Sequence, residues 1–388
     1  MPHHAVDGGR TLLYYEDSGA PEGSVDYVTV FLVHGTIFSS AIFRKMIPYA
    51  ARHDLRLVLI NCRDYPGSTL YSESELRALS SPDPATQASA LQARGLEFAE
   101  FIHRFIEMER IPPINVSQSP TGVQRGGFSL LGWSSGNCQT VPLLAHAHLV
   151  PEATRKLFDA HFRSFVMYGP YQILAPCVSK STYPTDISLP ATGETPTPGV
   201  WTPLRDSTLS TAEKFSQFSE WVSYYFTPTG FGASDDIDTP GITDALVARV
   251  ALHQNKTSPT NSAQWMPTVH RIGPQKMREV CHAEVMARSQ KYYQIIAPVV
   301  YRENVRRAVL QGKTSEGMVW PDLKVAVVWC DMSNSDVVSA AMKLKALARN
   351  NREQGEGRDV AFHKLEKANH FAHWDDPESF TSFLARVV

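Results

Sequence analysis

The sequence predicts an α/β fold with a mostly parallel central sheet, flanking helices and a large helical insertion before the penultimate strand. Strand and helix patterns alternate in both terminal stretches of the chain, as expected for a parallel sheet covered by helices. Between the strand pattern that ends at Tyr168 and the next one, which begins at Lys324, the chain is far longer than the roughly 30 residues of a βαβ unit. The total of 388 residues therefore fits one α/β body interrupted by an insertion.

Seven stretches are predicted to form the sheet because they are rich in β-branched, aromatic and other apolar residues. The second of them is almost continuously apolar, which is typical of a parallel strand buried on both faces. In chain order the predicted strands are Arg10–Glu16, Tyr27–Val33, Arg56–Asn61, Phe128–Leu131, Phe165–Tyr168, Lys324–Trp329 and Asp359–Phe362.

Helices are predicted between these strands at Ser39–His53, Ala88–Glu109 and Val337–Arg349, with a last one that opens at Asp376-Pro377. In the second, apolar residues recur at helical spacing. The Asp-Pro pair suits the N-cap and first position of a helix.

The insertion has its own pattern. Its first part, Ala175–Asp206, is dense in Pro, Thr and Ser and is expected to be an irregular loop. Ser210 and Glu213 form a capping box that starts a helix, and Pro274–Ala297 is a further helical stretch. We therefore expect residues 1–170 and 320–388 to form the core domain, and residues 171–319 to form a cap.

Composition excludes several classes of protein. Lys and Arg number 37 against 39 for Asp and Glu, a net charge of −2 without a basic block, so nucleic acid is an unexpected partner. No apolar run approaches the about 20 residues of a membrane span, and the first residues lack the pattern of a signal peptide. Five cysteines without CxxC spacing indicate reduced thiols. We expect a cytoplasmic protein with a small-molecule substrate, as a monomer or a homodimer.

The pattern G-x-S-x-G at residues 132–136 directly follows the predicted strand Phe128–Leu131. A nucleophile on a tight strand-to-helix turn has a strained backbone, and small residues two positions away avoid a clash. Ser134 has Gly132 and Gly136 at those positions, whereas Ser135 would have larger neighbours. Ser134 is therefore the predicted nucleophile, the alternative being a Gly-Ser turn without chemistry.

A second motif, His34-Gly35-Thr36, ends the strand Tyr27–Val33. A glycine at a strand end lets the chain turn beneath the nucleophile, so that backbone N–H groups can face the substrate carbonyl. The N–H groups of Thr36 and Ser135 are the predicted oxyanion hole. His34 is interpreted as a buried histidine that holds the loop by hydrogen bonds, rather than as a catalytic residue.

A serine nucleophile needs a base, and two histidines near the chain end, His370 and His373, compete for that role. A metal site made by these histidines and the aspartates that follow has little support, because the HxxH pattern lacks helical spacing and a general-base Glu. No metal and no organic cofactor are therefore expected. A histidine with an ordinary pKa near 6.5 would make the rate fall below about pH 6.

Three segments resemble the α/β-hydrolase superfamily, in particular its cap-bearing, fungal-type serine hydrolases: FLVHG, LLGWSSGN and NHFAHWDDPESF. The resemblance covers residues 10–170 and 320–388, and the insertion matches in position alone. The turn at residues 61–68 is similar to the family's D-x-R-G-x-G-x-S turn. The resemblance implies a hydrolase with a nucleophile elbow and a catalytic triad, and it selects His370 over His373 as the base.

The resemblance also says where the triad acid belongs. Some branches carry it after the strand Phe165–Tyr168, but there this sequence has Gly169. Others carry it after Lys324–Trp329, which leaves Asp331 and Asp336. Asp336 is similar to the family's D-x-V-V segment and is preferred. Asp331 stays the alternative, and either could instead be a helix N-cap.

Aromatic residues are numerous near the predicted site and in the insertion. Trp133, Tyr168, Tyr171 and Trp221 are the candidates for substrate contacts, although an aromatic stripe on a helix is more often packing than recognition. The shortage of charge around them favours a mid-sized, mostly apolar and uncharged substrate.

We therefore expect a carboxylesterase or lactonase that works through an acyl-enzyme. Carbon–carbon bond hydrolysis or lyase chemistry on the same scaffold is the alternative, as is a ligand receptor with residual hydrolase activity, because a fold alone does not decide chemistry. Epoxide hydrolase and dehalogenase chemistry is disfavoured, since both use a carboxylate where this chain has Ser134.

Overall fold

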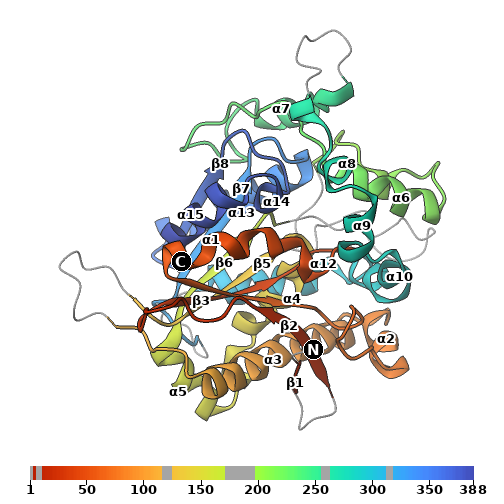
Figure 1. The fold of residues 1–388 in the computed structure, drawn as a ribbon. Coiled ribbons are helices and arrows are strands. Elements are labelled where there is room, and N and C mark those ends of the chain that lie inside the picture. Colours follow the sequence, from red (N-terminus) through yellow and green to blue (C-terminus); the bar gives the residue numbers. More distant parts are fainter. Residues whose placement is uncertain (1–2, 6–10, 116–124, 171–196, 255–262, 312–317) are drawn as a thin grey trace.

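The computed structural model describes residues 3–5, 11–115, 125–170, 197–254, 263–311 and 318–388 (Figure 1). Their centre is an eight-stranded sheet with the order β1-β2-β4-β3-β5-β6-β7-β8. The strands are β1 His3–Ala5, β2 Leu12–Asp17, β3 Val28–Val33, β4 Leu55–Ile60, β5 Phe128–Trp133, β6 Phe162–Tyr168, β7 Lys324–Cys330 and β8 Val360–Leu365. β2 runs antiparallel to its neighbours β1 and β4, and β3 to β8 are parallel. The predicted α/β class and all seven predicted strands are confirmed.

The strands are apolar on both faces because helices cover both sides of the sheet. Along β3, Val30 belongs to one apolar cluster and Phe31 to the other, as the two-residue repeat of a strand requires. The first cluster includes helical residues from 41–50 and 372–384, and the second includes residues from 98–106, 141–145 and 338–344. This is the continuous apolar pattern of a parallel sheet between two helical layers.

Figure 1 shows the long helix α3, Pro84–Glu109, crossing one face of the sheet together with α4, Asn137–Ala145, and α5, Glu152–His161. The final helix α15, Pro377–Val387, and α1, Ile47–Ala50, lie on the other face. Pro142 lies inside α4, and α4 packs closely on α3 there: a Cβ at Gly95 of α3 would lie 2.5 Å from the backbone nitrogen of Leu143.

Two of the predicted helices are broken, one in the core and one in the insertion. Ser39–His53 is a 3-10 turn Ser40–Met46, the α-helical turn α1 and a second 3-10 turn Ala51–His53. Pro48, at the second position of α1, cannot donate the backbone hydrogen bond that a continuous helix would need. In contrast, α13, Ser335–Glu353, is one continuous helix that begins two residues earlier than predicted.

The segment between β6 and β7 is described at residues 197–254, 263–311 and 318–323, where short helices alternate with turns and irregular chain. Its main helices are α6 Thr211–Trp221, α7 Ile242–Val247, α8 Thr268–Ile272, α9 Pro274–Val280 and α12 Pro298–Val305. The capping box of Ser210 and Glu213 is confirmed at the start of α6. The predicted helix Pro274–Ala297 is wrong as one element: it ends at Val280, where the chain pairs with the loop after β3, and resumes as α10 Ala283–Val285.

The core elements that escaped prediction include β1, α5 and α2, Glu73–Leu79. β1 pairs three residues with β2, too few for a strand pattern to show in the sequence. Helix α2 begins at a capping box of Ser72 and Glu75, the signal that could have revealed it.

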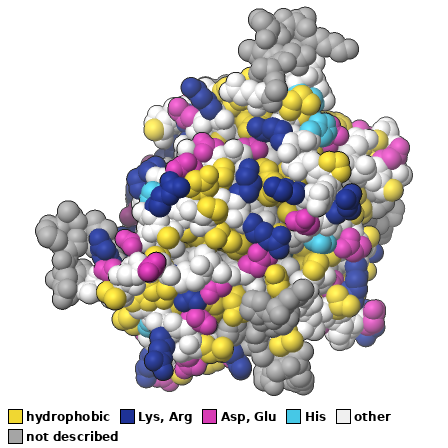
Figure 2. Space-filling view, in the orientation of Figure 1, with side chains coloured by type: hydrophobic (Ala, Val, Ile, Leu, Met, Phe, Trp, Pro, Cys, Tyr) yellow, Lys and Arg dark blue, Asp and Glu magenta, His cyan; other side chains and the backbone are white. Residues whose placement is uncertain are grey.

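Charges of both signs are interspersed over the face shown in Figure 2, without a one-sign patch. No helix in the described part of the chain combines the length and the apolar character that crossing a bilayer demands. Within the same ranges, no group of three or more His, Cys, Asp and Glu side chains is arranged to hold a metal ion.

Candidate active site

Ser134 sits on a sharp turn between β5 and α4. Its φ is 55°, a left-handed conformation that side chains other than glycine rarely adopt. A Cβ at Gly136 would lie 2.6 Å from the carbonyl oxygen of Val33, and one at Gly132 would collide with the hydroxyl of Thr140. The two glycines of G-x-S-x-G are therefore required by the packing of this turn, as the sequence predicted.

The loop after β3 lies directly against Ser134. A Cβ at Gly35 would lie 2.8 Å from the Cβ of Ser134, so glycine is needed for this approach. The hydroxyl of Thr36 donates a 2.6 Å hydrogen bond to the hydroxyl of Ser135. This bond ties together the two loops whose backbone N–H groups were predicted to form the oxyanion hole.

His34 holds this loop. Its Nε2 accepts a 3.0 Å hydrogen bond from the backbone N–H of Cys62, and its Nδ1 donates a 2.9 Å bond to the carbonyl oxygen of Gly35. Burial lowers the pKa of His34 to about 3, which keeps the imidazole neutral and matches this donor-acceptor pair. The structural interpretation of His34 agrees with these contacts.

The insertion also supports the loop after β3. Ile37 has φ 69°, a strained value for a β-branched residue, and its carbonyl oxygen accepts a 2.7 Å hydrogen bond from the N–H of His282. Phe38 pairs with Cys281, and the N–H of Ser39 donates to the carbonyl oxygen of Val280 at 2.8 Å. The conformation next to Thr36 is thus stabilised from the insertion, which the sequence did not reveal.

His370 lies beside the serine turn, in the loop after β8. Its imidazole packs on Trp133, with the two ring centroids 5.2 Å apart. The indole N–H of Trp133 donates a 3.1 Å hydrogen bond to the backbone carbonyl oxygen of His370. The side chain is 1% exposed, and burial lowers its pKa to about 3. The hydroxyl of Ser333 lies 3.5 Å from its Nδ1.

Gly169, at the end of β6, faces the same edge of the imidazole. A Cβ there would lie 3.0 Å from Nδ1 and 2.8 Å from Cε1 of His370, and the φ of Gly169 is 51°. The competing histidine, His373, is buried in α14, Ala372–Asp375, with its Nδ1 3.3 Å from the hydroxyl of Tyr168.

The two candidate acids have other partners. The carboxylate of Asp336, fully buried, accepts bonds of 2.9 and 3.0 Å from Arg205 of the insertion. Burial raises the pKa of Asp336 to about 6, and Arg205 partly counteracts that rise. Burial raises the pKa of Asp331, and the backbone at Lys367 and Ala368 partly counteracts that rise. Its Oδ1 is buried without a hydrogen-bond partner among the described residues. Asp336 is thus held by Arg205, and its role as the acid that orients His370 stays a prediction.

Of the four residues predicted to contact the substrate, the structure describes Trp133, Tyr168 and Trp221. Trp133 and Tyr168 are fully buried beneath the His370 loop, and the Tyr168 hydroxyl donates to the carbonyl oxygen of His370 at 3.3 Å. They support the loop from below. Trp221 lines a cavity of the insertion whose described lining includes neither Ser134 nor His370. Tyr171 lies outside the described residues.

Sequence reasoning missed Asn369, which anchors the His370 loop to the insertion. Its side-chain amide donates 2.8 Å hydrogen bonds to the carbonyl oxygen of Ser223 and to the hydroxyl of Thr268. Its side-chain oxygen accepts from the N–H of Phe371 at 2.9 Å. The residues on both sides of the imidazole are thereby held in place.

Asp375, at the end of α14, is a second anchor. Its Oδ2 accepts from the hydroxyls of Tyr225 and Thr268, at 2.8 and 2.5 Å, and from Arg271 at 2.5 Å. Nothing in the local sequence distinguishes Asp375 from its neighbour Asp376, which caps α15. The difference arises from segments more than 100 residues away in the chain.

The sheet order and the serine turn between β5 and α4 define the α/β-hydrolase fold. No protein-family model and no curated protein sequence matches the chain. Among solved structures, it is similar to bromoperoxidase from Bacillus anthracis, at 11% identity and TM-score 0.47 over 100% of this chain and 98% of that one. It is also similar to a putative aryl esterase from Burkholderia cenocepacia, with 13% identity and TM-score 0.47 over 99% of this chain and 97% of that one. The chain is also similar to N-acyl homoserine lactonase AidH, with 11% identity and TM-score 0.45 over 100% of this chain and 97% of that one.

Proposed function

We propose that this protein is a serine hydrolase that cleaves a carboxylic ester or lactone through an acyl-enzyme. Ser134 attacks the carbonyl carbon, His370 takes the hydroxyl proton and returns it to the leaving group, and water then releases the acid. The N–H groups of Thr36 and Ser135 stabilise the oxyanion. The observation that carries the proposal is the strained Ser134 turn, packed against Gly35 and tied to Thr36 through Ser135.

The base works in an unusual setting. A neutral imidazole is the form that accepts a proton, and burial keeps His370 neutral. The hydroxyl of Ser333 lies 3.5 Å from its Nδ1, and we propose that Ser333 helps to orient the ring.

The substrate proposed is mid-sized, largely apolar and uncharged, such as an aromatic ester or a macrolactone. The apolar rings of Phe38 and Phe371 pack on Trp133 beside the serine turn, with centroids 6.0 and 5.1 Å from its ring. Apolar surroundings favour apolar ligands because burial of apolar surface is the main source of their affinity.

A panel of p-nitrophenyl and naphthyl esters tests the proposal. The wild-type protein should hydrolyse members of the panel with burst kinetics, and Ser134→Ala should lose at least a thousandfold in kcat/KM. Ser135→Ala is the matched control: it removes the hydroxyl that Thr36 binds but keeps the backbone N–H, so it should retain activity within about tenfold. Equal activity of Ser134→Ala and wild type would refute the proposal.

A ligand receptor with residual hydrolase activity is the second candidate. The observation in its favour is that Asp336, the preferred candidate acid, is bound to Arg205. Single-turnover acylation without steady-state turnover would identify this case.

A further inference from the structure

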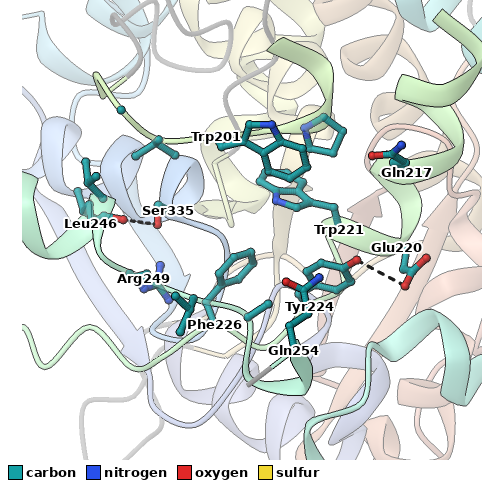
Figure 3. Close-up of a pocket in the computed structure, with 16 residues that line it drawn as sticks. Trp201, Gln217, Glu220, Trp221, Tyr224, Phe226, Leu246, Arg249, Gln254 and Ser335 are labelled. Carbon is teal, nitrogen blue, oxygen red and sulfur yellow. Dashed lines mark hydrogen bonds between the residues drawn. The ribbon is translucent and has the colours of Figure 1, made fainter. Parts of the chain in front are cut away.

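The insertion contains a cavity whose described lining does not include Ser134 (Figure 3). It has a volume of about 460 Å³, within the range of small-molecule sites. The residues on which the argument depends are Trp201, Trp221, Tyr224, Phe226, Arg249 and Ser335. They come from α6, from the chain on both sides of it, from the segment after α7 and from the first position of α13.

The cavity is walled by aromatic rings. Trp221 and Phe226 are 3% and 9% exposed, and their ring centroids lie 6.3 Å apart. Trp201, in contrast, is 54% exposed, although its indole N–H is held by Asp206 at 3.0 Å. Trp201 and Trp221 both line the cavity and are drawn as sticks in Figure 3. These faces suit a flat apolar ring.

Arg249 places a positive charge at one end of the cavity. Its Nε donates to the carbonyl oxygen of Thr227 at 2.9 Å and its Nη2 to that of Asp331 at 2.7 Å. Its Nη1 is buried without a hydrogen-bond partner in the part of the chain that the structure describes. The guanidinium also lies over the ring of Phe226, 5.7 Å from its centroid. Its hydrogen bonds to Thr227 and Asp331 go to carbonyl oxygens, and a carbonyl dipole replaces a full negative charge poorly.

Two further observations indicate that this end favours an anion. Burial lowers the pKa of Arg249 to about 9, so the attraction of the nearby Asp331 does not offset desolvation. Ser335, beside Arg249 in Figure 3, is the first residue of the 19-residue helix α13, and the N-terminus of a helix carries partial positive charge. The acidic residue of the lining, Glu220, lies at the opposite end, where it accepts a 3.4 Å bond from Tyr224.

We propose that this cavity is a binding site for an aromatic monocarboxylate, with the ring between Trp201, Trp221 and Phe226 and the carboxylate toward Arg249. The charge of Glu220 at the far end sets the direction of the ligand, because a reversed carboxylate would face a like charge. The described lining of this cavity includes neither Ser134 nor His370, so the proposal does not require the chemistry proposed for Ser134.

Isothermal titration of the Ser134→Ala protein with 2-naphthoate tests the proposal. We expect saturable one-to-one binding, and at least tenfold weaker binding of the uncharged 2-naphthalenemethanol. Arg249→Gln should abolish this preference for the carboxylate. Trp201→Ala should weaken 2-naphthoate at least threefold, whereas Trp201→Phe, which keeps a ring, should weaken it less. Arg352→Gln, a change of an exposed arginine remote from the cavity lining, is the control for net charge and should bind as the parent does.

Three results would overturn the proposal: no saturable binding of 2-naphthoate, equal binding of acid and alcohol, or loss of binding once Ser134 of the wild type carries a phosphonate. The last result would place the ligand at Ser134 instead. If circular dichroism shows that Arg249→Gln does not fold, the proposal is tested by Arg249→Lys, which keeps the charge, together with Trp201→Ala and Trp201→Phe. Failure of Ser134 to react with a phosphonate would contradict the hydrolase proposal alone and would leave this site unaffected.

Discussion

Gly169 lies directly against the imidazole of His370, so that a Cβ at this position would be 2.8 Å from Cε1 and 3.0 Å from Nδ1. The strand β6 ends one residue earlier, at Tyr168, whose hydroxyl supports the same loop from below. Glycine, which has no Cβ, therefore leaves room for the ring at the position where the resemblance to the α/β-hydrolase superfamily implies an acid in some branches.

Gly169→Ala should lower kcat/KM at least tenfold, because the new methyl group displaces the imidazole of His370. The positive φ should also cost about 1 kcal/mol of folding free energy. Gly230→Ala is the matched control: its φ is 69°, and no atom lies within 4 Å of the position that its Cβ would take. It should lose similar stability and keep its activity. Ester hydrolysis and thermal melts measure both, and unchanged activity in Gly169→Ala would contradict the contact.

Asp336→Asn should destabilise the fold by about 2 to 3 kcal/mol, because it leaves Arg205 without its buried carboxylate partner. Activity per folded molecule should stay within about threefold of wild type. Urea unfolding and active-site titration separate the two effects.

Arg205→Gln provides the companion variant. It should cause a comparable loss of stability, and the double variant should lose less than the sum of the two. A stable Asp336→Asn protein with activity reduced a thousandfold or more would instead identify Asp336 as the triad acid.

Asp375→Asn should reduce kcat at least tenfold, since it weakens the bonds to Arg271, Thr268 and Tyr225 that fix the loop bearing His370. Asp376→Asn is the neighbouring control. It alters only the cap of α15 and should leave kcat within about twofold. Stopped-flow measurement of the acylation step would show the difference, and equal rates for the two variants would exclude a positioning role for Asp375.

The pH dependence of kcat/KM should be shifted to acid. Burial holds the pKa of His370 near 3, so the base stays neutral in the free enzyme down to about pH 4. The rate should therefore be nearly constant from pH 7 to 5, whereas an unperturbed histidine would make it fall below about pH 6. A midpoint near 6.5 in the pH profile would show that His370 is solvated in the active form.

Stability must be followed in the same buffers, because buried histidines oppose folding in acid. The folded pKa values of His34 and His370, about 3, lie below the unfolded value of 6.5, so the unfolded chain binds protons first as the pH falls. Each residue then removes about 1.4 kcal/mol per pH unit between 6.5 and 3. Asp336, whose pKa is raised to about 6, acts in the opposite direction below pH 6. The kcat/KM values are compared only at those pH values where unfolding curves show that the protein is folded.

The sheet could be predicted from sequence because each parallel strand carries its own signal, a run of buried residues such as Tyr27–Val33. The serine turn could be predicted for a similar reason: Gly132, Ser134 and Gly136 report a local steric requirement. These features depend on neighbours in the chain.

The partner of Asp336 and the supports of the His370 loop could not be predicted, because they depend on contacts between distant segments. Asp336 is paired with Arg205 across 131 positions, and Thr268 reaches Asp375 across 107. The break at Val280 arises in the same way, since the chain there leaves its helix to pair with the loop after β3. The apolar periodicity that predicts a helix does not indicate contacts with a distant segment.

The central claim, that Ser134 is a nucleophile, is tested most directly by reaction with a fluorophosphonate followed by peptide mapping. We predict one adduct per chain, located on Ser134, absent in Ser134→Ala and retained in Ser135→Ala. A chain that remains unlabelled, or that carries the adduct on another residue in both variants, would contradict the account.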